Sequence, residues 1–454
     1  MVADAPRGTR PAAGRGGGDR AAAHRAVHGA GARRDRGDHR HRARDAGTGG
    51  GGPVPAVRQR GPGTGRAAVA AAAQPGGADG PGPDHGGAGG APPGGRGHLR
   101  HLVQQPLGQR GGKGRARARD GQHGGGQARA AGPALRLPVA PALAMGNTVV
   151  VKPAPQDPLS VYRMAGALAE AGIPPGVVNV VGGTSTAVGE AAVGAPAVDM
   201  VSFTGSTAVG RRIAEVCGRG MKRRLMELGG KGAALVFDDA DPEAAVRAIG
   251  TTFTFYSGQI CTAPTRVIAQ RGIHDRLVAG LAALAARLPV GHPAEPGTVV
   301  GPVISAAHRD RVESYVALGR AEGARLVAGG ERPSFERGFW VAPTLFTECA
   351  AGMRIVREEI FGPVVVVVPF DTEDEGVALV NDSEYGLMDY VWSGDTARAF
   401  RVAARLRSGG VGINTVGRHM EAPFGGFRAS GVGRDVGSYA LHAYSETQAI
   451  VWPG

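Results

Sequence analysis

Short apolar runs and stretches of helical spacing alternate along the chain from about residue 137 onward. The run TVVVK (148–152) is typical of a buried strand, and the apolar positions that follow it recur at helical intervals until Gly172. The same pairing of a strand with a helix recurs at 198–220, 233–256 and 266–288. Strands that alternate with helices predict an α/β fold built from parallel βαβ units.

Further elements complete this framework. Residues 176–183 form a β-branched run, and a short helical pattern follows at 185–195. The uninterrupted valines of GPVVVVVPF (362–370) predict a buried strand. The last pattern, YSETQAIVW (444–452), predicts a strand at or near the edge of a sheet.

Residues 1–137 show neither the helical nor the strand periodicity of apolar residues. They contain no Ser, Asn, Glu, Ile, Phe, Tyr, Trp or Cys and consist mostly of Gly, Ala, Arg and Pro. A segment of this composition cannot bury enough apolar area to offset its chain entropy. We therefore expect the N-terminal third to be irregular, as a low-complexity segment that is either disordered or translated out of frame.

The net charge of +13 is confined to this N-terminal third. Residues 1–137 carry 22 Arg and one Lys against eight Asp, a net charge of +15, which leaves −2 for residues 138–454. A disordered basic arm that binds nucleic acid through RRDRGDHRHRAR is one interpretation, whereas a transit peptide would be rich in Ser. We favour a third hypothesis, in which GC-rich DNA is read in a shifted frame and the protein has no nucleic-acid partner.

The cysteines and the hydropathy argue against a disulfide-rich, metal-binding, membrane-spanning or secreted protein. Cys217, Cys261 and Cys349 are too few and too scattered for a disulfide framework or a metal cluster. The sequence contains no run of about 18 apolar residues, so we expect no membrane span. The start MVADAPRGTR also lacks the apolar stretch of a secretory signal. We expect a cytoplasmic protein with a free thiol, no metal and no membrane contact.

The segment from Gly205 to Gly210 follows a predicted strand and opens a predicted helix. Glycine lets a phosphate approach the backbone, and a helix N-terminus offers free N–H groups and the positive end of the helix dipole. The segment lacks the three-glycine dinucleotide fingerprint. The alternative is therefore an ordinary turn between a strand and a helix, capped by Ser206 and Thr207.

Two further segments carry candidate catalytic side chains. Glu227 precedes two glycines in MELGGK, and in a cleft it would serve as a general base on water; a surface carboxylate is the alternative. Cys261 in YSGQICTAPTR has small and polar neighbours that predict an accessible turn. Its thiolate would be a nucleophile if its pKa were lowered or backbone N–H groups lay nearby, and a buried structural cysteine is the alternative.

Six segments in this order together resemble the aldehyde dehydrogenase superfamily. They are PALAMGNTVVVKPA, FTGSTAVG, MELGGK, GQICTAPTR, EEIFGPV and APFGGFRASGVGRD. One such match could arise by chance, but six in the family's order are specific. The resemblance runs from about residue 137 to residue 454 and does not extend into residues 1–137.

The resemblance implies oxidation of an aldehyde to a carboxylic acid with reduction of NAD or NADP. Cys261 matches the nucleophile, which forms a thiohemiacetal and then a thioester, and its own amide matches one oxyanion donor. Glu227 matches the base that activates water to hydrolyse the thioester, and a carboxylate there favours a free acid over transfer to coenzyme A.

The resemblance also implies a cofactor site. Lys152 matches the residue that binds the adenosine ribose, while Glu359 and Phe361 match the pair that holds the nicotinamide ribose and ring. The remaining implied cofactor residues belong to the glycine turn and to its neighbour in MELGGK, and they are Gly205, Ser206, Gly210 and Leu228. Many NAD-preferring members of the family have a glutamate at the position of Pro155. We therefore expect NAD as the slightly favoured cofactor and keep NADP as the alternative.

One family motif is absent. A Pro-aromatic-Asn motif, whose Asn side chain is the second oxyanion donor, usually precedes PALAMGN, but Asn147 is the first Asn of this chain. By analogy with other oxyanion holes, one lost donor costs on the order of 10²–10³ in rate. We also expect the first strands of the cofactor domain and one hairpin of the oligomerisation element to be missing.

The implied architecture is an aldehyde dehydrogenase-like α/β fold. Residues 138–228 would form the remaining part of a Rossmann-like cofactor domain, 229–430 an α/β catalytic domain, and 431–454 a C-terminal segment with a β oligomerisation strand. That strand, TQAIVW, would pair with a partner subunit in a homodimer or homotetramer, and the substrate would be a small aldehyde. Two alternatives stay open: an inactive truncated or mistranslated homologue, and a Cys-dependent esterase that needs no nicotinamide.

Overall fold

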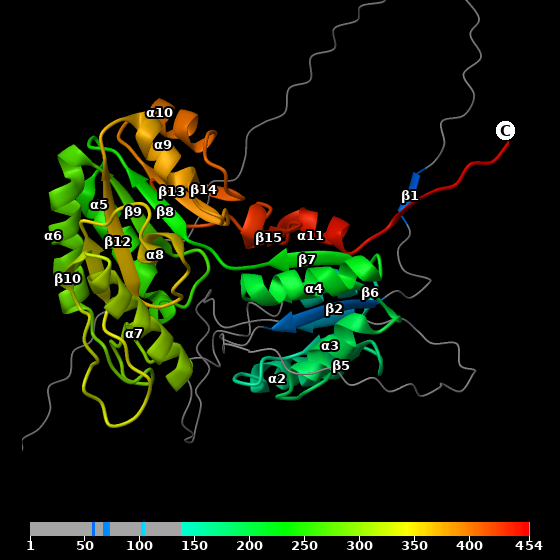
Figure 1. The fold of residues 1–454 in the computed structure, drawn as a ribbon. Helices are drawn as coiled ribbons and strands as arrows, with labels where there is room; N and C mark the ends of the chain where they lie inside the picture. The colour runs from blue at the N-terminus through cyan, green and yellow to red at the C-terminus, as the bar shows by residue number, and fades with distance from the viewer. Residues whose placement is uncertain (1–56, 60–66, 73–100, 105–137, 454) are drawn as a thin grey trace, which may run out of the picture. The chain divides into compact units, whose positions relative to one another are not determined.

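Two seven-stranded sheets carry most of the helices of this protein (Figure 1). The computed structural model describes residues 57–59, 67–72, 101–104 and 138–453. The described residues between 57 and 452, which include both sheets, belong to one compact unit. The α/β fold expected from the alternation of strands and helices is confirmed.

The first sheet has the strand order β15-β7-β6-β2-β3-β4-β5, and all neighbours are parallel except β15 and β7. Its strands are β15 (Gly431–Val432), β7 (Arg223–Glu227), β6 (Val198–Thr204), β2 (Ala67–Ala72), β3 (His101–Gln104), β4 (Thr148–Lys152) and β5 (Val178–Val180). Its helices are α2 (Leu159–Glu170), α3 (Thr186–Gly194), α4 (Thr207–Arg219) and α11 (Gly437–Ala443), and residues 138–144 are also helical.

Two apolar clusters hold these helices on the first sheet. Phe203 of β6 packs with Ile213 of α4 in one cluster. Val151 of β4 packs with Val161 of α2 in the other. The β-branched and aromatic side chains of the strands therefore meet the apolar stripe of each helix, which is the packing that their spacing predicts.

The second sheet has the order β10-β11-β12-β9-β8-β13-β14, with only β10 antiparallel to its neighbour. Its strands are β10 (Arg325–Ala328), β11 (Thr344–Thr347), β12 (Val364–Phe370), β9 (Pro264–Gln270), β8 (Gly232–Val236), β13 (Met388–Trp392) and β14 (Gly410–Ile413). Its helices are α5 (Pro242–Thr254), α6 (Arg271–Arg287), α7 (Ala306–Ala321), α8 (Arg354–Arg357), α9 (Glu373–Asn381) and α10 (Thr396–Ala403).

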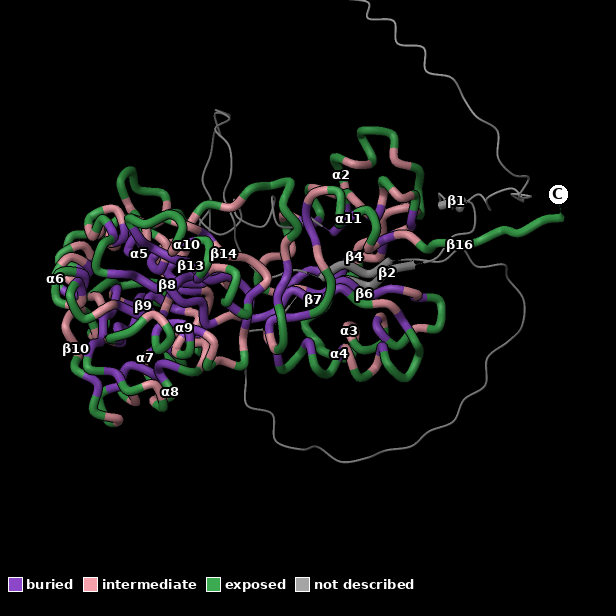
Figure 2. Tube along the Cα trace, turned by 90° about the horizontal axis from the view of Figure 1, so that it is seen from above, coloured by how far each residue is buried: buried purple, intermediate pink, exposed green. Residues whose placement is uncertain are grey.

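Successive side chains of these strands enter two different apolar layers. In β12, Val364 and Val366 pack with the layer that contains α7, α9 and α10, whereas Val365 and Val367 pack with the layer of α5 and α6. Figure 2 shows the resulting run of buried residues along β8, β9 and β13. A strand that is apolar at every position is thus one with helices on both faces.

The strands and helices predicted from residue 148 onward are confirmed. The TVVVK run is β4, the valine run at 362–370 contains β12, and the segment 198–220 contains β6 and α4. The last predicted strand is β16 (Thr447–Ala449). The predicted domain boundaries near 228 and 430 stay a prediction, although the chain passes from the first sheet to the second between β7 and β8 and returns at β15.

The structure differs from our expectation in the N-terminal third, where it contains three strands. β2 and β3 lie between β6 and β4 in the first sheet, and β1 (Val57–Gln59) pairs antiparallel with β16. The irregular segment that we expected is therefore interrupted at these places, and β16 pairs within its own chain. Ladder hydrogen bonds join backbone groups, so a strand can form without an apolar side-chain pattern. The rest of residues 1–137 lies outside the described residues.

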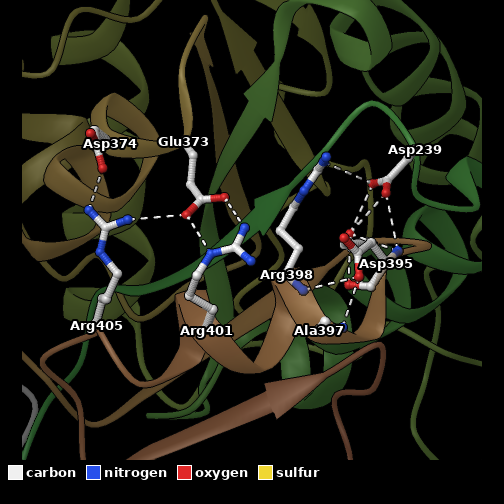
Figure 3. A network of polar contacts seen from close by, with 9 residues as sticks. Asp239, Glu373, Asp374, Asp395, Ala397, Arg398, Arg401 and Arg405 are labelled. Carbon is white, nitrogen blue, oxygen red and sulfur yellow. Dashed lines mark hydrogen bonds and ion pairs between the residues drawn. The ribbon is translucent and has the colours of Figure 1, made fainter.

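An ionic network joins α9 to α10 on the surface of the second sheet (Figure 3). Glu373 accepts from Arg401 at 2.8 Å and from Arg405 at 3.1 Å. Asp395 caps α10 by accepting from the amides of Ala397 and Arg398. The network fixes two neighbouring helix ends and lies apart from the segments that carry candidate chemistry.

Among the described residues, no helix is both long and apolar enough to cross a membrane.

Candidate active site

Glu227 is the last residue of β7, and its backbone is tied to the glycine turn. Thr204 of β6 pairs in register with Glu227, and the amide of Gly205 donates to the Glu227 carbonyl at 3.0 Å. The side chain is buried, with 7% exposure, and neither carboxyl oxygen has a hydrogen-bond partner in the part of the chain that the structure describes. A buried carboxyl with both oxygens unpaired is costly for stability alone and is typical of a functional group.

The glycine turn lies against the residue after Glu227. A Cβ on Gly210 would lie 2.5 Å from Cδ2 of Leu228, so close packing of α4 on this side chain requires glycine. Ser206 caps α4, because its Oγ accepts from the amide of Val209 at 3.4 Å. The structure thus brings together four predicted cofactor residues at the N-terminus of one helix: Gly205, Ser206, Gly210 and Leu228.

Cys261 follows a backbone turn of unusual conformation. Tyr256, Ser257 and Gly258 have successive left-handed φ values of 51°, 59° and 74°. This conformation costs each non-glycine residue about 1–3 kcal/mol. A Cβ on Gly258 would lie 2.1 Å from the backbone carbon of Gly362, so only glycine fits there. The turn that precedes Cys261 is therefore strained and closely packed.

Hydrogen bonds from neighbouring segments hold this strained turn. Ser257 Oγ donates to the carbonyl of Gly301 at 2.7 Å. Gln259 uses both ends of its amide: Nε2 donates to the Tyr256 carbonyl at 3.0 Å, and Oε1 accepts from the amide of Ile304 at 3.0 Å. A strained backbone persists only where surrounding contacts hold it, and these hydrogen bonds hold the turn in its left-handed conformation.

Burial raises the pKa of the Cys261 thiol to about 12. The charge of Arg418 and the residue's own amide oppose this rise, while Glu227 and Glu359 add to it. The residue is partly accessible, but its sulfur lies in surroundings that disfavour the thiolate. The lowered pKa that we considered for a nucleophile is not what this arrangement gives, because desolvation outweighs the nearby cation.

Burial also raises the pKa of Glu227 well above its ordinary value. Asp435 adds to the rise, and Arg434 and Arg418 oppose it. The pKa of Asp435 is itself raised to about 6 by burial, opposed by the amide of Val436, which donates to Oδ1 at 2.8 Å. Burial therefore shifts both Glu227 and Cys261 toward their protonated forms.

Glu359 lies against the two glycines that follow Leu228. One carboxylate oxygen accepts from the amide of Gly230 at 2.9 Å, and a Cβ on Gly229 would lie 2.1 Å from the other. A Cβ on Gly230 would lie 2.6 Å from the Cys261 carbonyl. Both glycines are therefore needed for Glu359 and Cys261 to approach the same short segment. Burial raises the pKa of Glu359 to about 7, opposed mainly by the Gly230 amide.

Lys231 is a residue of this segment that we did not single out from the sequence. Its ammonium is buried, with 2% exposure of the residue, and has no hydrogen-bond partner among the described residues. Burial, followed by the charge of Arg266, lowers its pKa to about 7, and Glu359 opposes that change. In the sequence, only its position directly after the paired glycines of MELGGK could have indicated that Lys231 lies near the site.

Phe361 and Lys152 complete the predicted set at two different places. Phe361 is left-handed with φ 61°, and its carbonyl lies 2.7 Å from Nε2 of the buried His308. Lys152 ends β4, where its Nζ donates to the Pro153 carbonyl at 3.2 Å and burial lowers its pKa. Two strands, β2 and β3, separate β4 from β6 in the first sheet. Lys152 therefore lies in a different part of this sheet from the glycine turn.

The geometry defines a cysteine site at the junction of two sheets. The first sheet supplies Glu227 and the glycine turn, and the loop before β9 supplies Cys261. The described residues contain no cluster of three or more His, Cys, Asp or Glu side chains that could hold a metal ion. A cysteine, a buried carboxyl and a helix N-terminus on connected segments are the groups that an enzyme combining covalent catalysis with a nucleotide cofactor would need.

Comparison with known proteins agrees with this class. The model of the aldehyde dehydrogenase family matches residues 135–450. A geranial dehydrogenase from Castellaniella defragrans is 46% identical over 312 residues, which are 69% of this chain and 65% of that protein. A betaine aldehyde dehydrogenase from Bacillus subtilis is 43% identical over 317 residues, 69% of this chain and 64% of that protein.

Solved structures give the same result. The aldehyde dehydrogenase of Mycobacterium tuberculosis complexed with NAD+ matches with a TM-score of 0.68 and 40% identity, over 70% of this chain and 65% of that one. An NAD-dependent aldehyde dehydrogenase from Sinorhizobium meliloti matches with a TM-score of 0.67 and 41% identity, over 69% and 62%. This chain belongs to the aldehyde dehydrogenase family. It spans about 65% of the length of the curated relatives that it matches.

Proposed function

We propose that this protein oxidises an aldehyde to a carboxylic acid with NAD or NADP, through a covalent thioester on Cys261. One observation carries the proposal: the carbonyl of Cys261, which follows a strained turn, lies against the pair of glycines that begins two residues after the buried Glu227, beside the N-terminus of α4. A structural cysteine would not need a strained turn, and a structural glutamate would not leave both carboxyl oxygens unpaired.

In the proposed reaction, Cys261 Sγ gives its proton to Glu227, which passes it to solvent, and attacks the carbonyl carbon of the aldehyde, which forms the C–S bond of a thiohemiacetal. The Cys261 amide would donate to the oxygen that gains negative charge. A bound nicotinamide would accept the hydride released when the thiohemiacetal becomes a thioester. Water then attacks the thioester carbon, Glu227 takes the proton of that water, and cleavage of the C–S bond releases the acid and the thiol.

The proton balance sets the pH dependence of this reaction. Glu227 takes a proton only when it is ionised, and burial raises its pKa well above the ordinary value. Cys261 attacks only as a thiolate, and its pKa is also raised, to about 12. Both groups therefore favour a rate that increases from neutral to alkaline pH.

The residues present fit a dinucleotide. The N-terminus of α4 at Gly205 and Ser206 suits a pyrophosphate, because it presents backbone donors and the positive end of the helix dipole. Gly229 leaves the space beside Glu359 that a larger residue would fill. Lys152 would hold the adenosine ribose, Leu228 and Gly210 would form the wall of the turn, and Glu359 with Phe361 would hold the nicotinamide ribose and ring.

NAD is the cofactor favoured by the comparisons, since the matched structure from Mycobacterium tuberculosis is an NAD+ complex. Proline at position 155 supplies no carboxylate that would repel a 2′-phosphate, so NADP is included in the proposal. We also propose that the working protein is a homodimer or homotetramer. The exposed C-terminal side chains of Ile450, Val451 and Trp452 support this, because exposed apolar groups in sequence are typical of a contact with another chain.

The test is turnover by the purified full chain with an aldehyde panel and each cofactor, followed as reduced nicotinamide. We expect Cys261→Ala to abolish turnover. Glu227→Gln should lower the steady-state rate by about 10²–10⁴-fold while it leaves a rapid first turnover, with the acyl group trapped on Cys261 and visible by intact mass. Its slow phase should also lose the rise with pH.

Two results would contradict the proposal. Ester cleavage that needs Cys261 without any nicotinamide reduction would indicate the Cys-dependent esterase. A well-folded chain that shows neither activity would indicate an inactive homologue that lacks the oxyanion Asn. Cys349→Ala is the matched control, because it removes a buried thiol outside the site and should retain the wild-type rate.

A further inference from the structure

One face of α7 contacts the segment that carries Glu359 and Phe361. Nε2 of His308 lies 2.7 Å from the Phe361 carbonyl, and the guanidinium of Arg311 donates to the Glu359 carbonyl at 2.8 Å. Residues three apart lie on the same face of a helix, so one row of side chains reaches both backbone carbonyls. The two residues that would hold the nicotinamide ribose and ring are therefore fixed by α7.

The same face of α7 fixes both ends of this segment. The hydroxyl of Tyr315 donates to Oε2 of Glu358 at 2.5 Å. At the other end, a Cβ on Gly362 would lie 2.6 Å from Cγ2 of Val312. Val312 and Tyr315 follow His308 by four and seven positions, which is the spacing of one helix face. Residues 358–362 are therefore packed along α7 over their whole length.

The segment directly before α7 holds the turn of Cys261. Ser257 Oγ donates to the carbonyl of Gly301, and Oε1 of Gln259 accepts from the amide of Ile304. One helix and the residues that precede it thus join the candidate nucleophile to the candidate nicotinamide site. Reacting groups must be held in a fixed mutual geometry for a fast reaction, and α7 is the element that connects these two sites.

Phe361 is the residue of this segment that most needs support. It is not glycine, yet its φ is 61°, a conformation that costs about 1–3 kcal/mol and persists only where the surroundings hold it. His308 contacts both parts of Phe361. Besides the hydrogen bond to the carbonyl, the two ring centres lie 6.0 Å apart with their planes at 67°, an edge-to-face contact.

The environment of His308 defines its protonation. A carbonyl only accepts, so Nε2 carries the proton of this hydrogen bond. Nδ1 is buried and has no hydrogen-bond partner among the described residues. Burial lowers the pKa of His308, the bond to the Phe361 carbonyl opposes this change, and the charge of Arg311 adds to it. Burial thus favours a neutral imidazole whose single N–H donates to Phe361.

We propose that His308 is a positioning residue for nicotinamide, because its Nε2–H holds Phe361 in the conformation that binds the ring. The inference rests on the proposed function, in which Phe361 holds the nicotinamide ring. Without this donor, Phe361 is free to relax to a negative φ, which moves its side chain. The adenosine end of the cofactor should not change, because Lys152 and α4 belong to the first sheet and α7 to the second.

Binding of NAD+ and of AMP to the full chain, measured by calorimetry, tests the inference without turnover. AMP contains only the adenosine end of the cofactor. His308→Met keeps a side chain of similar length and removes the donor. We expect the Kd of NAD+ to rise about tenfold, while the Kd of AMP changes by less than about twofold. A general loss of structure would instead weaken both ligands.

Three further variants make the result specific. His308→Gln carries an amide donor that reaches about as far as Nε2 and should retain most of the NAD+ affinity. His308→Asn is too short to reach the carbonyl and should behave like His308→Met, which it replaces if the methionine variant does not melt cooperatively. His442→Met removes an exposed histidine of α11 and should change neither Kd.

Four results overturn the inference. They are a wild-type chain that binds NAD+ no more tightly than AMP, a His308→Met variant with wild-type NAD+ affinity, equal weakening of NAD+ and AMP, and a His308→Gln variant as weak as His308→Met.

Steady-state kinetics separate the inference from the proposed function. In His308→Met we expect the KM for NAD+ to rise and the KM for the aldehyde to stay unchanged. If the wild-type chain oxidises no aldehyde, the proposed function fails, while the two Kd values still decide the role of His308. If the variant oxidises an aldehyde with the wild-type KM for NAD+, the proposed function stands and the inference fails.

Discussion

Cys261 and Glu227 are both acidic groups whose pKa values are raised by burial. For the thiol, desolvation raises the pKa to about 12, against a partial opposing effect of Arg418. For the carboxyl, both oxygens lack a hydrogen-bond partner among the described residues. Burial therefore disfavours the charged form of both residues. Reactivity depends on how much thiolate and carboxylate form, and pH is the simplest variable that changes both.

The first prediction concerns the pH dependence of Cys261 alkylation. With a pKa of about 12, the thiolate fraction grows about tenfold for each pH unit across the range in which the protein is handled. The rate of alkylation by iodoacetamide should therefore climb from pH 7 to pH 10 without a plateau. In the unfolded chain the same cysteine should level off near its ordinary pKa. A plateau near pH 8 in the folded protein would contradict the raised pKa.

The second prediction concerns the buried ammonium of Lys231. Its pKa is about 7 in the folded protein and about 10.5 in the unfolded chain, so the unfolded chain binds more protons between these values. The free energy of unfolding should then rise with pH across that window. Lys231→Met keeps the shape and removes the titration, so the variant should be more stable than wild type at pH 7, by several kcal/mol at most, and the gain should shrink toward pH 10.

Lys222 is the matched control for this substitution. It is also buried, but its Nζ donates to the carbonyls of Val193 and Ala195 at 2.8 and 2.6 Å. Lys222→Met leaves two carbonyls without a donor and should destabilise the protein at every pH. Urea unfolding of both variants at pH 7 and near pH 10 makes the comparison. Destabilisation by Lys231→Met at pH 7 would show that its ammonium has an essential partner.

At the scale of single elements, the strained turn before Cys261 is the most specific feature. Three consecutive left-handed residues form it, and its glycine packs against the backbone of Gly362. Regular elements tolerate substitution because side chains on their surfaces can shift. A turn packed between backbone atoms cannot shift, so its sequence requirement is strict.

The third prediction compares two glycine substitutions. Gly258→Ala places a Cβ 2.1 Å from the Gly362 carbon at a φ of 74° and should cost more than about 3 kcal/mol of stability. Gly166→Ala adds a methyl group in the middle of α2 with no atom within 4 Å and should gain about 0.5–1 kcal/mol. Chemical denaturation measures both. Equal effects would mean that the turn is not as closely packed as described.

The fourth prediction separates a helix cap from an ion pair in the network of Figure 3. Asp395 accepts from two amides at the start of α10, and Asp395→Ala should cost about 1 kcal/mol. Among the described residues, Glu373 is paired with the exposed side chains of Arg401 and Arg405. Glu373→Gln should cost less than the loss of the cap, under about 1 kcal/mol, with a smaller effect at high salt. Thermal melts at two salt concentrations test the order of the two costs.

At the scale of the whole molecule, the family match covers the chain from residue 135 onward and excludes almost all of the N-terminal third. The family match begins at residue 135, close to where the apolar periodicity begins. The first Asn of the chain is Asn147, so residues 1–146 supply no Asn side chain as an oxyanion donor. The three strands within residues 57–104 supply backbone to the sheets without supplying that side chain.

The fifth prediction concerns the gene. If residues 1–137 come from a shifted reading frame, translation of the same DNA in another frame should give ordinary strand and helix patterns. It should also give a Pro-aromatic-Asn motif shortly before residue 137. Expression of the corrected frame should then raise kcat by about 10²–10³ over the present chain, because one oxyanion donor returns. Resequencing that finds neither pattern nor motif would falsify the frame hypothesis.

Local patterns were sufficient for the elements that we predicted from residue 148 onward and for the order of the motifs. The strands β4, β6, β8, β9 and β12 follow from β-branched runs, because buried parallel strands are apolar at every position. The short strands β1, β2 and β3 could not be predicted. Their Ala-rich or polar sequences carry no period, and only backbone pairing with distant strands selects them.

The sequence by itself determined the family and the identity of the candidate residues, because those depend on residue types at fixed spacing along the chain. Only the tertiary structure decided which of them lie against the same segment and in which direction their pKa values shift. Cys261 and Glu227 lie 34 positions apart, and the Cys261 carbonyl reaches the segment after Glu227 only because Gly230 has no Cβ. Their raised pKa values come from burial, and the cation that opposes them comes from Arg418, far along the chain. Burial and long-range contact are properties of the folded chain, and no local pattern contains them.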